Sequence, residues 1–143
     1  MQRDKVVKEA TEWLGTAWQH QTSLKQVACD CVGLVRGVYR EVSGIDVSID
    51  EDYPDSWHLF RQEERLYEEA KRHMKEISLA DALPGDILIF GFYHHPASHA
   101  GILIAPDRFI HSYQDIGSVI ETRLDEAWRK RLRFAFRYPR VES

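Results

Sequence analysis

The feature that most constrains the fold is a change of hydrophobic periodicity near the middle of the chain. Before the segment LADALPGD (residues 79–86), apolar residues recur at helical spacing, whereas short β-type runs separated by turns follow it. Helices first and strands second favour an α+β fold, with N-terminal helices packed on a C-terminal antiparallel β-sheet. A chain of 143 residues suits one domain, and we expect residues 1–143 to form it.

Three helices are expected in the first half of the chain. The first covers residues 4–14 with Asp4 as its N-cap, and the second begins at Asp30 and ends at Gly44. A third, rich in charged residues, is expected over residues 58–76. The stretch between the first two helices is expected to be a loop.

Short strands dominate the second half. They are expected over residues 87–92, 99–104, 108–113, 119–122 and 132–138, with a short helix over 125–131. The second and third of these strands are close enough in sequence to form a hairpin.

Two cysteines, the only ones in the chain, flank Asp30 in the stretch VACDCVGLV. One residue of separation makes a poor disulfide, so we expect free thiols and folding in a reducing cytoplasm. Cys31 lies in the first turn of the expected helix, where unpaired N–H groups and the helix dipole favour a thiolate and can hold an oxyanion. Cys29 lies one residue outside that field, so Cys31 is the candidate nucleophile.

A cysteine nucleophile needs a base, and the base needs an orienting partner. His99 and His111 lie on the two strands of the expected hairpin. If that hairpin turns about Pro106 with an odd number of loop residues, Gly101 pairs with His111. Both histidines then share one face of the sheet, within roughly 8 Å of each other. An even loop would place them on opposite faces.

Simpler interpretations exist for the same residues. A cysteine near a helix start is often a small buried side chain, and a histidine on a strand is often structural. A zinc site is a further interpretation, with Cys29, Cys31 and one of His94, His95 and His99 as ligands. Zinc cysteines are usually separated by about two to four residues, so we expect no metal or other cofactor.

The bulk properties exclude two classes of function. A net charge of −4 and a pI near 6.0 argue against electrostatic binding of nucleic acid. The N-terminal residues alternate charged and apolar side chains, so we expect neither a signal peptide nor a membrane span.

The motifs resemble those of the NlpC/P60 cysteine peptidases, in particular their short phage-associated members. The nucleophile motif of the family is similar to residues 30–35 (DCVGLV), its base motif to residues 99–102 (HAGI), and its third motif to residues 109–111 (FIH). Residues 13–21 (WLGTAWQHQ) and 83–90 (LPGDILIF) resemble two further segments of the family, in the same order along the chain.

The resemblance implies a papain-like fold and hydrolysis of peptidoglycan stem peptides, typically at the γ-D-glutamyl–diamino acid bond. It implies that Cys31 is the nucleophile, His99 the general base and His111 the residue that orients the base. It also implies delivery by a phage tail or tail-like particle, with phage-tail proteins as partners, synthesis in the cytoplasm and action in the periplasm or cell wall.

Three residues near the nucleophile are candidate substrate contacts: Trp18, His20 and Asp30. Trp18 replaces a tyrosine frequent in the family, and Val32 replaces a residue that is often small and polar. Indole offers only an N–H donor, so a hydroxyl contact is lost or replaced. These departures leave two alternatives open: a catalytically weak or inactive structural component of a tail, or the same triad acting on another amide or ester.

Overall fold

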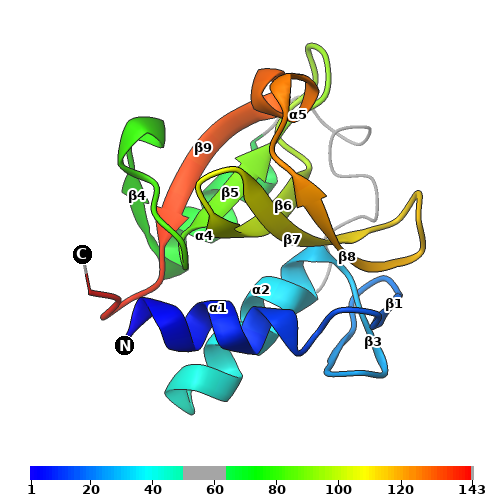
Figure 1. The fold of residues 1–143 in the computed structure, drawn as a ribbon, viewed down its shortest axis with the longest axis vertical. Helices are drawn as coiled ribbons and strands as arrows, with labels where there is room; N and C mark the ends of the chain where they lie inside the picture. The colour runs from blue at the N-terminus through cyan, green and yellow to red at the C-terminus, as the bar shows by residue number, and fades with distance from the viewer. Residues whose placement is uncertain (50–63, 143) are drawn as a thin grey trace.

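The computed structural model describes residues 1–49 and 64–142. The helices in these ranges are α1 (Arg3–Thr11), α2 (Cys31–Ser43), α4 (Arg65–His73) and α5 (Glu126–Arg131), with a 3-10 turn η1 at Leu79–Asp81. The strands are β1 (Ala17–Trp18), β2 (Ser23–Leu24), β3 (Ala28–Cys29), β4 (Lys75–Ile77), β5 (Ile87–Phe90), β6 (His99–Ala105), β7 (Arg108–Tyr113), β8 (Ser118–Arg123) and β9 (Leu132–Arg137). Helices precede most of the sheet along the chain, as the periodicity predicts (Figure 1).

The strands form one sheet in the order β2-β3-β1-β8-β7-β6-β5-β9-β4. Neighbours run antiparallel except β1 and β3, which are parallel. The expected α+β fold with N-terminal helices on a mostly antiparallel sheet is therefore confirmed. The expected boundaries of β5 to β9 and α5 agree with the structure to within two residues.

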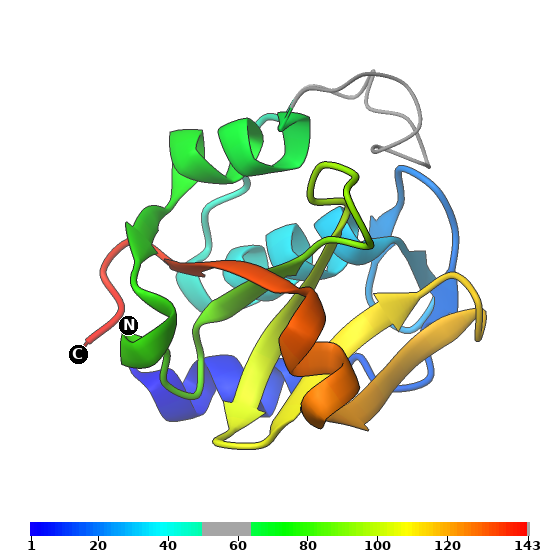
Figure 2. The same cartoon turned by 90° about the horizontal axis from the view of Figure 1, so that it is seen from above.

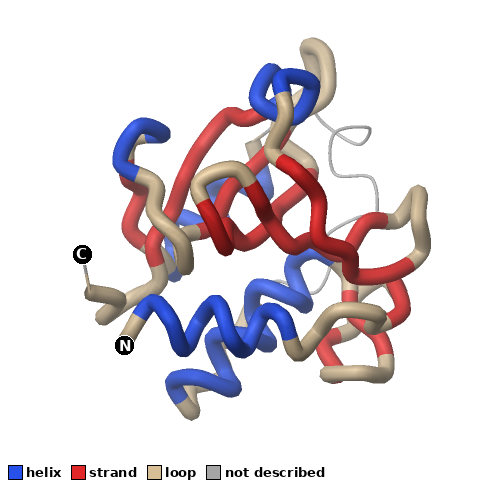
Figure 3. Tube along the Cα trace, in the orientation of Figure 1, coloured by secondary structure: helices blue, strands red, loops and turns tan. Residues whose placement is uncertain are grey.

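Apolar side chains cover both faces of the central strands. α1 and α2 pack against β6 on one face, and α5 lies on the opposite side of the sheet (Figures 2 and 3). β5 shows the consequence most clearly, since Ile87 and Ile89 join the cluster under the helices while Leu88 and Phe90 join the cluster that contains Trp128. All four residues of β5 are buried, which explains its continuous apolar sequence.

Three expectations for the N-terminal region are wrong. α1 ends at Thr11 rather than at residue 14, because residues 12–15 form a turn. It begins at Arg3 after Gln2, and Asp4 lies inside the first turn, where it complements the helix dipole instead of capping it. The expected loop after α1 contains the short strands β1, β2 and β3. Two-residue strands carry no readable periodicity, and β1 pairs with the distant β8 through Ala17 and Ser118.

The third expected helix is correct only in part. Residues 58–63 of that helix lie outside the described residues, and α4 ends at His73, so its expected end at Glu76 is wrong. Residues 75–77 form β4 on the edge of the sheet, with Glu76 opposite Phe136 of β9. Pairing with a strand that lies far along the chain overrides the local helical pattern here.

The hairpin of β6 and β7 has the expected register but a different turn. Its turn contains two residues, Pro106 and Asp107, and the register shifts by one position between Leu103 and Ala105. This β-bulge adds one residue to β6 and so has the effect of an odd loop. Ile102 pairs with Ile110, and the same register places Gly101 opposite His111.

Candidate active site

Asp30 forms the N-cap of α2 and also holds the preceding loop. Its Oδ1 accepts a hydrogen bond from the backbone N–H of Gly33 at 2.7 Å, and its Oδ2 accepts one from the N–H of Gln21 at 2.8 Å. An added Cβ at Gly33 would lie 1.9 Å from the carbonyl oxygen of Thr22. The glycine of the nucleophile motif is therefore required where the helix start meets this loop, and Cys31 becomes the first residue of α2.

The two histidines of the hairpin contact each other directly. His99 Nε2 lies 2.7 Å from His111 Nδ1, within hydrogen-bonding distance. The other ring nitrogen of His111, Nε2, lies 2.8 Å from Oγ1 of Thr122 on β8. The structure thus brings together the two histidines predicted from the sequence and adds Thr122, for which no motif gave a signal.

Aromatic side chains surround the histidine pair. Tyr113 stacks on the His111 ring with centroids 5.1 Å apart, and Trp128 of α5 meets that ring edge-on at 5.2 Å. Phe109 lies 4.4 Å from it on β7. Both imidazoles are buried as a result, with 7% of His99 and 0% of His111 exposed. Trp128 was also missed by the sequence reasoning, because its approach depends on how α5 packs on the sheet.

The start of β6 lies against the sulfur of Cys31. The backbone of Ala100, the residue that follows His99, forms a hydrogen bond with the Cys31 thiol, as does the backbone of Val32. His99 directs Nε2 at His111, which leaves Nδ1 as the nitrogen for the cysteine. The thiol therefore meets β6 at the residue next to His99, and His99 in turn contacts the orienting imidazole of His111.

Burial dominates the ionisation of the site. It raises the pKa of Cys31 to about 12, with a further contribution from the charge of Asp30, while the backbone hydrogen bonds of Ala100 and Val32 oppose this shift. Burial also lowers the pKa of His99 to about 4. The expected resting thiolate at the helix start is therefore wrong, because desolvation of the charged form outweighs the helix N–H groups. Both shifts favour the uncharged thiol and the uncharged imidazole.

Cys29 is a small core residue. It is fully buried, and burial raises the pKa of its thiol to about 12. Its carbonyl oxygen accepts a hydrogen bond from Ser112 Oγ at 2.8 Å. Neither cysteine forms a disulfide, and no group of three or more metal-ligating side chains occurs among residues 1–49 and 64–142. The zinc interpretation therefore has no support in this part of the chain.

The three candidate substrate contacts lie in the segments that lead to the nucleophile. Trp18 is partly buried on β1, where it is the ladder partner of Cys29. His20 Nδ1 lies 3.7 Å from Asp30 Oδ2, so the structure brings these two residues together beside the start of α2. Their contact with a substrate remains a prediction.

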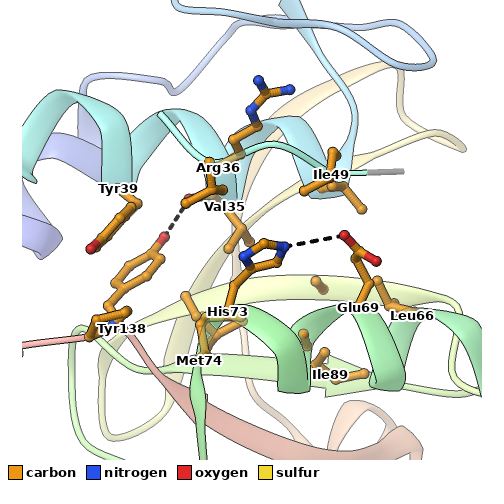
Figure 4. Close-up of a pocket in the computed structure, with 16 residues that line it drawn as sticks. Val35, Arg36, Tyr39, Ile49, Leu66, Glu69, His73, Met74, Ile89 and Tyr138 are labelled. Carbon is orange, nitrogen blue, oxygen red and sulfur yellow. Dashed lines mark hydrogen bonds and ion pairs between the residues drawn. The ribbon is translucent and has the colours of Figure 1, made fainter. Parts of the chain in front are cut away.

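A mostly apolar pocket lies on the α2 side of the sheet, between α2, α4 and β5 (Figure 4). Its volume is about 620 Å³, part of it open to solvent. Val32 and Ala100, the residues that follow Cys31 and His99, contribute to its wall. His73 and Glu69 of α4 lie within hydrogen-bonding distance at its edge, with Nε2 and Oε1 3.3 Å apart.

A cysteine at the N-terminus of a helix, set against a histidine pair on an antiparallel sheet, defines the papain-like class of cysteine-hydrolase folds. The sequence profile of the NlpC/P60 family matches residues 15–137, which include Cys31, His99 and His111. This chain belongs to the NlpC/P60 family.

Known relatives agree with this assignment. Murein DD-endopeptidase MepS/Murein LD-carboxypeptidase of Escherichia coli strain K12 is 24% identical over 129 residues, which cover 90% of this chain and 59% of the relative. The NlpC/p60 domain of the peptidoglycan hydrolase SagA is 23% identical with a TM-score of 0.64, and the match covers 94% of this chain and 97% of that domain. NlpC2 from Trichomonas vaginalis has a TM-score of 0.70 at 19% identity, over 95% of this chain and 46% of that structure.

The chain spans about three fifths of the length of the curated E. coli relative. Within residues 1–49 and 64–142, no helix has both the length and the apolar character needed to cross a bilayer.

Proposed function

We propose that this protein is a cysteine peptidase that hydrolyses peptidoglycan stem peptides. The contact of 2.7 Å between His99 and His111 carries the proposal, because it gives the base beside Cys31 a defined orientation. The E. coli relative is named a murein endopeptidase, and SagA is described as a peptidoglycan hydrolase, which supports the same substrate class for this chain.

The uncharged resting state determines the first chemical step. His99 Nδ1 removes the proton of the Cys31 thiol as the sulfur attacks the carbonyl carbon of the substrate. The backbone N–H of Cys31 donates to the oxygen that becomes negative in the tetrahedral intermediate. The imidazolium of His99 then protonates the leaving amine, and water hydrolyses the thioester through the same base.

The γ-D-glutamyl–diamino acid bond is the expected site of cleavage. Trp18, His20 and Asp30 lie in the segments next to the nucleophile, where they would contact the stem peptide. Asp30 supplies a buried carboxylate beside His20, and this charge favours a substrate ammonium group.

A defined muropeptide tests the proposal. The wild-type protein and the Cys31→Ser and Cys29→Ser variants are each incubated with stem peptides of different diamino acids, and the new amines and product masses are measured. Cleavage by wild type and Cys29→Ser but not by Cys31→Ser is expected. Absence of cleavage of every stem peptide by folded wild-type protein would refute the proposal and favour the structural alternative. Turnover of a parallel panel of other amides and esters would instead show the same triad acting on a different substrate.

Delivery by a phage tail or tail-like particle is the finer part of the proposal. It is supported by the resemblance of residues 13–21 to the phage-type members, and it makes phage-tail proteins the expected partners. Immunodetection of the protein in purified particles from the producing cells tests it. Particles without the protein would exclude this route.

A further inference from the structure

We infer that Thr122 is a positioning residue that sets the tautomer of His111 and, through it, keeps Nδ1 of His99 available as the base. The effect of Thr122 on His99 as a catalytic base rests on the proposed peptidase function. The tautomer of His111 depends only on the contacts among three side chains and can be measured without a substrate.

The three side chains form one hydrogen-bonded series. His99 Nε2 lies 2.7 Å from His111 Nδ1, and His111 Nε2 lies 2.8 Å from Thr122 Oγ1. A neutral imidazole has one nitrogen that donates and one that accepts. Burial lowers the pKa of His111 to about 2, with the charge of His99 as a second cause, so its ring is neutral at working pH. The position of one proton therefore determines the position of the next.

Two proton arrangements satisfy this series, and only one of them is productive. In the first, His99 Nε2–H donates to His111 Nδ1, His111 Nε2–H donates to Thr122 Oγ1, and Nδ1 of His99 carries a lone pair. In the second, Thr122 donates to His111, His111 Nδ1–H donates to His99 Nε2, and Nδ1 of His99 already holds a proton. The second arrangement cannot accept the proton of the Cys31 thiol.

The surroundings of Thr122 favour the productive arrangement. Thr122 is partly exposed, so its hydroxyl can donate to water while its oxygen accepts from His111. In the productive arrangement Nδ1 of His99 can accept a proton from a thiol, whereas in the other it presents an N–H, for which sulfur is a weak acceptor. Phe109, Tyr113 and Trp128 pack around the His111 ring and offer it no comparable carbonyl or carboxylate oxygen.

The strand register places Thr122 where it can serve this role. On β7 and β8, Phe109 is opposite Thr122 and His111 is opposite Ile120. Thr122 is therefore the diagonal neighbour of His111 on the same face of the sheet. Valine at this position keeps the branched shape of threonine and removes the acceptor. A buried N–H without an acceptor is costly, so His111 then shifts its proton to Nδ1 and blocks His99.

Nitrogen-15 NMR of the two histidines, together with steady-state kinetics, tests the inference. Wild type and Thr122→Ser are expected to carry the His111 proton on Nε2, and Thr122→Val is expected to carry it on Nδ1. For Thr122→Val, kcat is expected to fall about tenfold with KM little changed, as the loss of one hydrogen bond would cause. Thr11→Val, which makes the same chemical change at an exposed position of α1, serves as the control and leaves both measurements unchanged.

The outcomes separate this inference from the proposed function. A His111 proton on Nδ1 in the wild type, or an unchanged tautomer and kcat in Thr122→Val, overturns the inference while peptidase activity stands. An inactive wild type with the expected tautomers refutes the peptidase function and retains the role of Thr122 in fixing the ring. A kcat close to that of wild type in Thr122→Ser, together with a lowered kcat in Thr122→Val, supports both the role of Thr122 and the peptidase function.

Discussion

Arg137 makes a two-pronged contact with the buried carboxylate of Asp86: Nε lies 3.0 Å from Oδ1 and Nη2 lies 3.0 Å from Oδ2. Asp86 belongs to the Pro-Gly-Asp segment before β5, and Arg137 is the last residue of β9. Arg3 of α1 adds a third contact, with Nη1 3.0 Å from Oδ1. The carboxylate therefore joins the N-terminal helix to the sheet that carries the histidines.

Removal of this carboxylate is expected to destabilise the fold strongly. Asp86→Ala leaves two largely buried guanidinium groups without their counter-charge, and breaking a buried ion pair from one side costs about 3–5 kcal/mol. Urea unfolding measures the change in the free energy of unfolding. Asp4→Ala, which removes an exposed carboxylate from α1, should cost less than about 1 kcal/mol. Equal effects of the two substitutions would contradict the role of Asp86.

Alkylation is expected to distinguish the two cysteines. Cys31 is 8% exposed and Cys29 is 0% exposed, so iodoacetamide should modify Cys31 first in the folded protein. Because burial raises the pKa of Cys31, the rate should increase steadily as the pH rises above neutral. Peptide mass mapping after timed labelling checks both points. Earlier modification of Cys29 would contradict the assignment of the nucleophile.

The pH dependence of catalysis follows from the neutral resting pair. The reaction needs an unprotonated His99, and burial lowers its pKa to about 4, so kcat/KM should rise through that pH and then level off through neutrality. The pKa values measured from the pH profile of kcat/KM are properties of the interacting thiol–imidazole pair rather than of either group alone. A narrow bell centred near neutrality would indicate a preformed thiolate–imidazolium pair and contradict this mechanism.

The free energy of unfolding should fall on acidification, because burial lowers the pKa of His99 in the folded protein. The unfolded chain protonates His99 near its ordinary pKa of about 6.5, whereas the folded site does so only near pH 4. Between these values the unfolded state binds more protons, so the free energy of unfolding decreases as the pH drops from about 6.5 to about 4. Thermal unfolding across this range measures the effect. Burial lowers the pKa of His111 as well, to about 2, so His99→Gln should reduce the dependence without abolishing it. The exposed His94→Gln should leave it nearly unchanged.

Several parts of this protein were determined by its sequence alone. The helix from Asp30 to Gly44 follows from a capping carboxylate and a glycine that adopts a left-handed conformation, with φ of 77°. The motifs around Cys31, His99 and His111 are likewise enough to identify the family. These features depend on residues within a few positions of one another, so the order of residues is sufficient to predict them.

Tertiary structure decided the rest. β4 forms because it pairs with β9, and β1 pairs with β8 from the other half of the chain. The bulge between Leu103 and Ala105 sets the histidine register, and the contact of Thr122 with His111 needs the alignment of β7 with β8. The ionisation of Cys31 depends on how completely the surrounding chain excludes water. Each of these depends on residues that lie far apart in sequence and meet only in the folded protein.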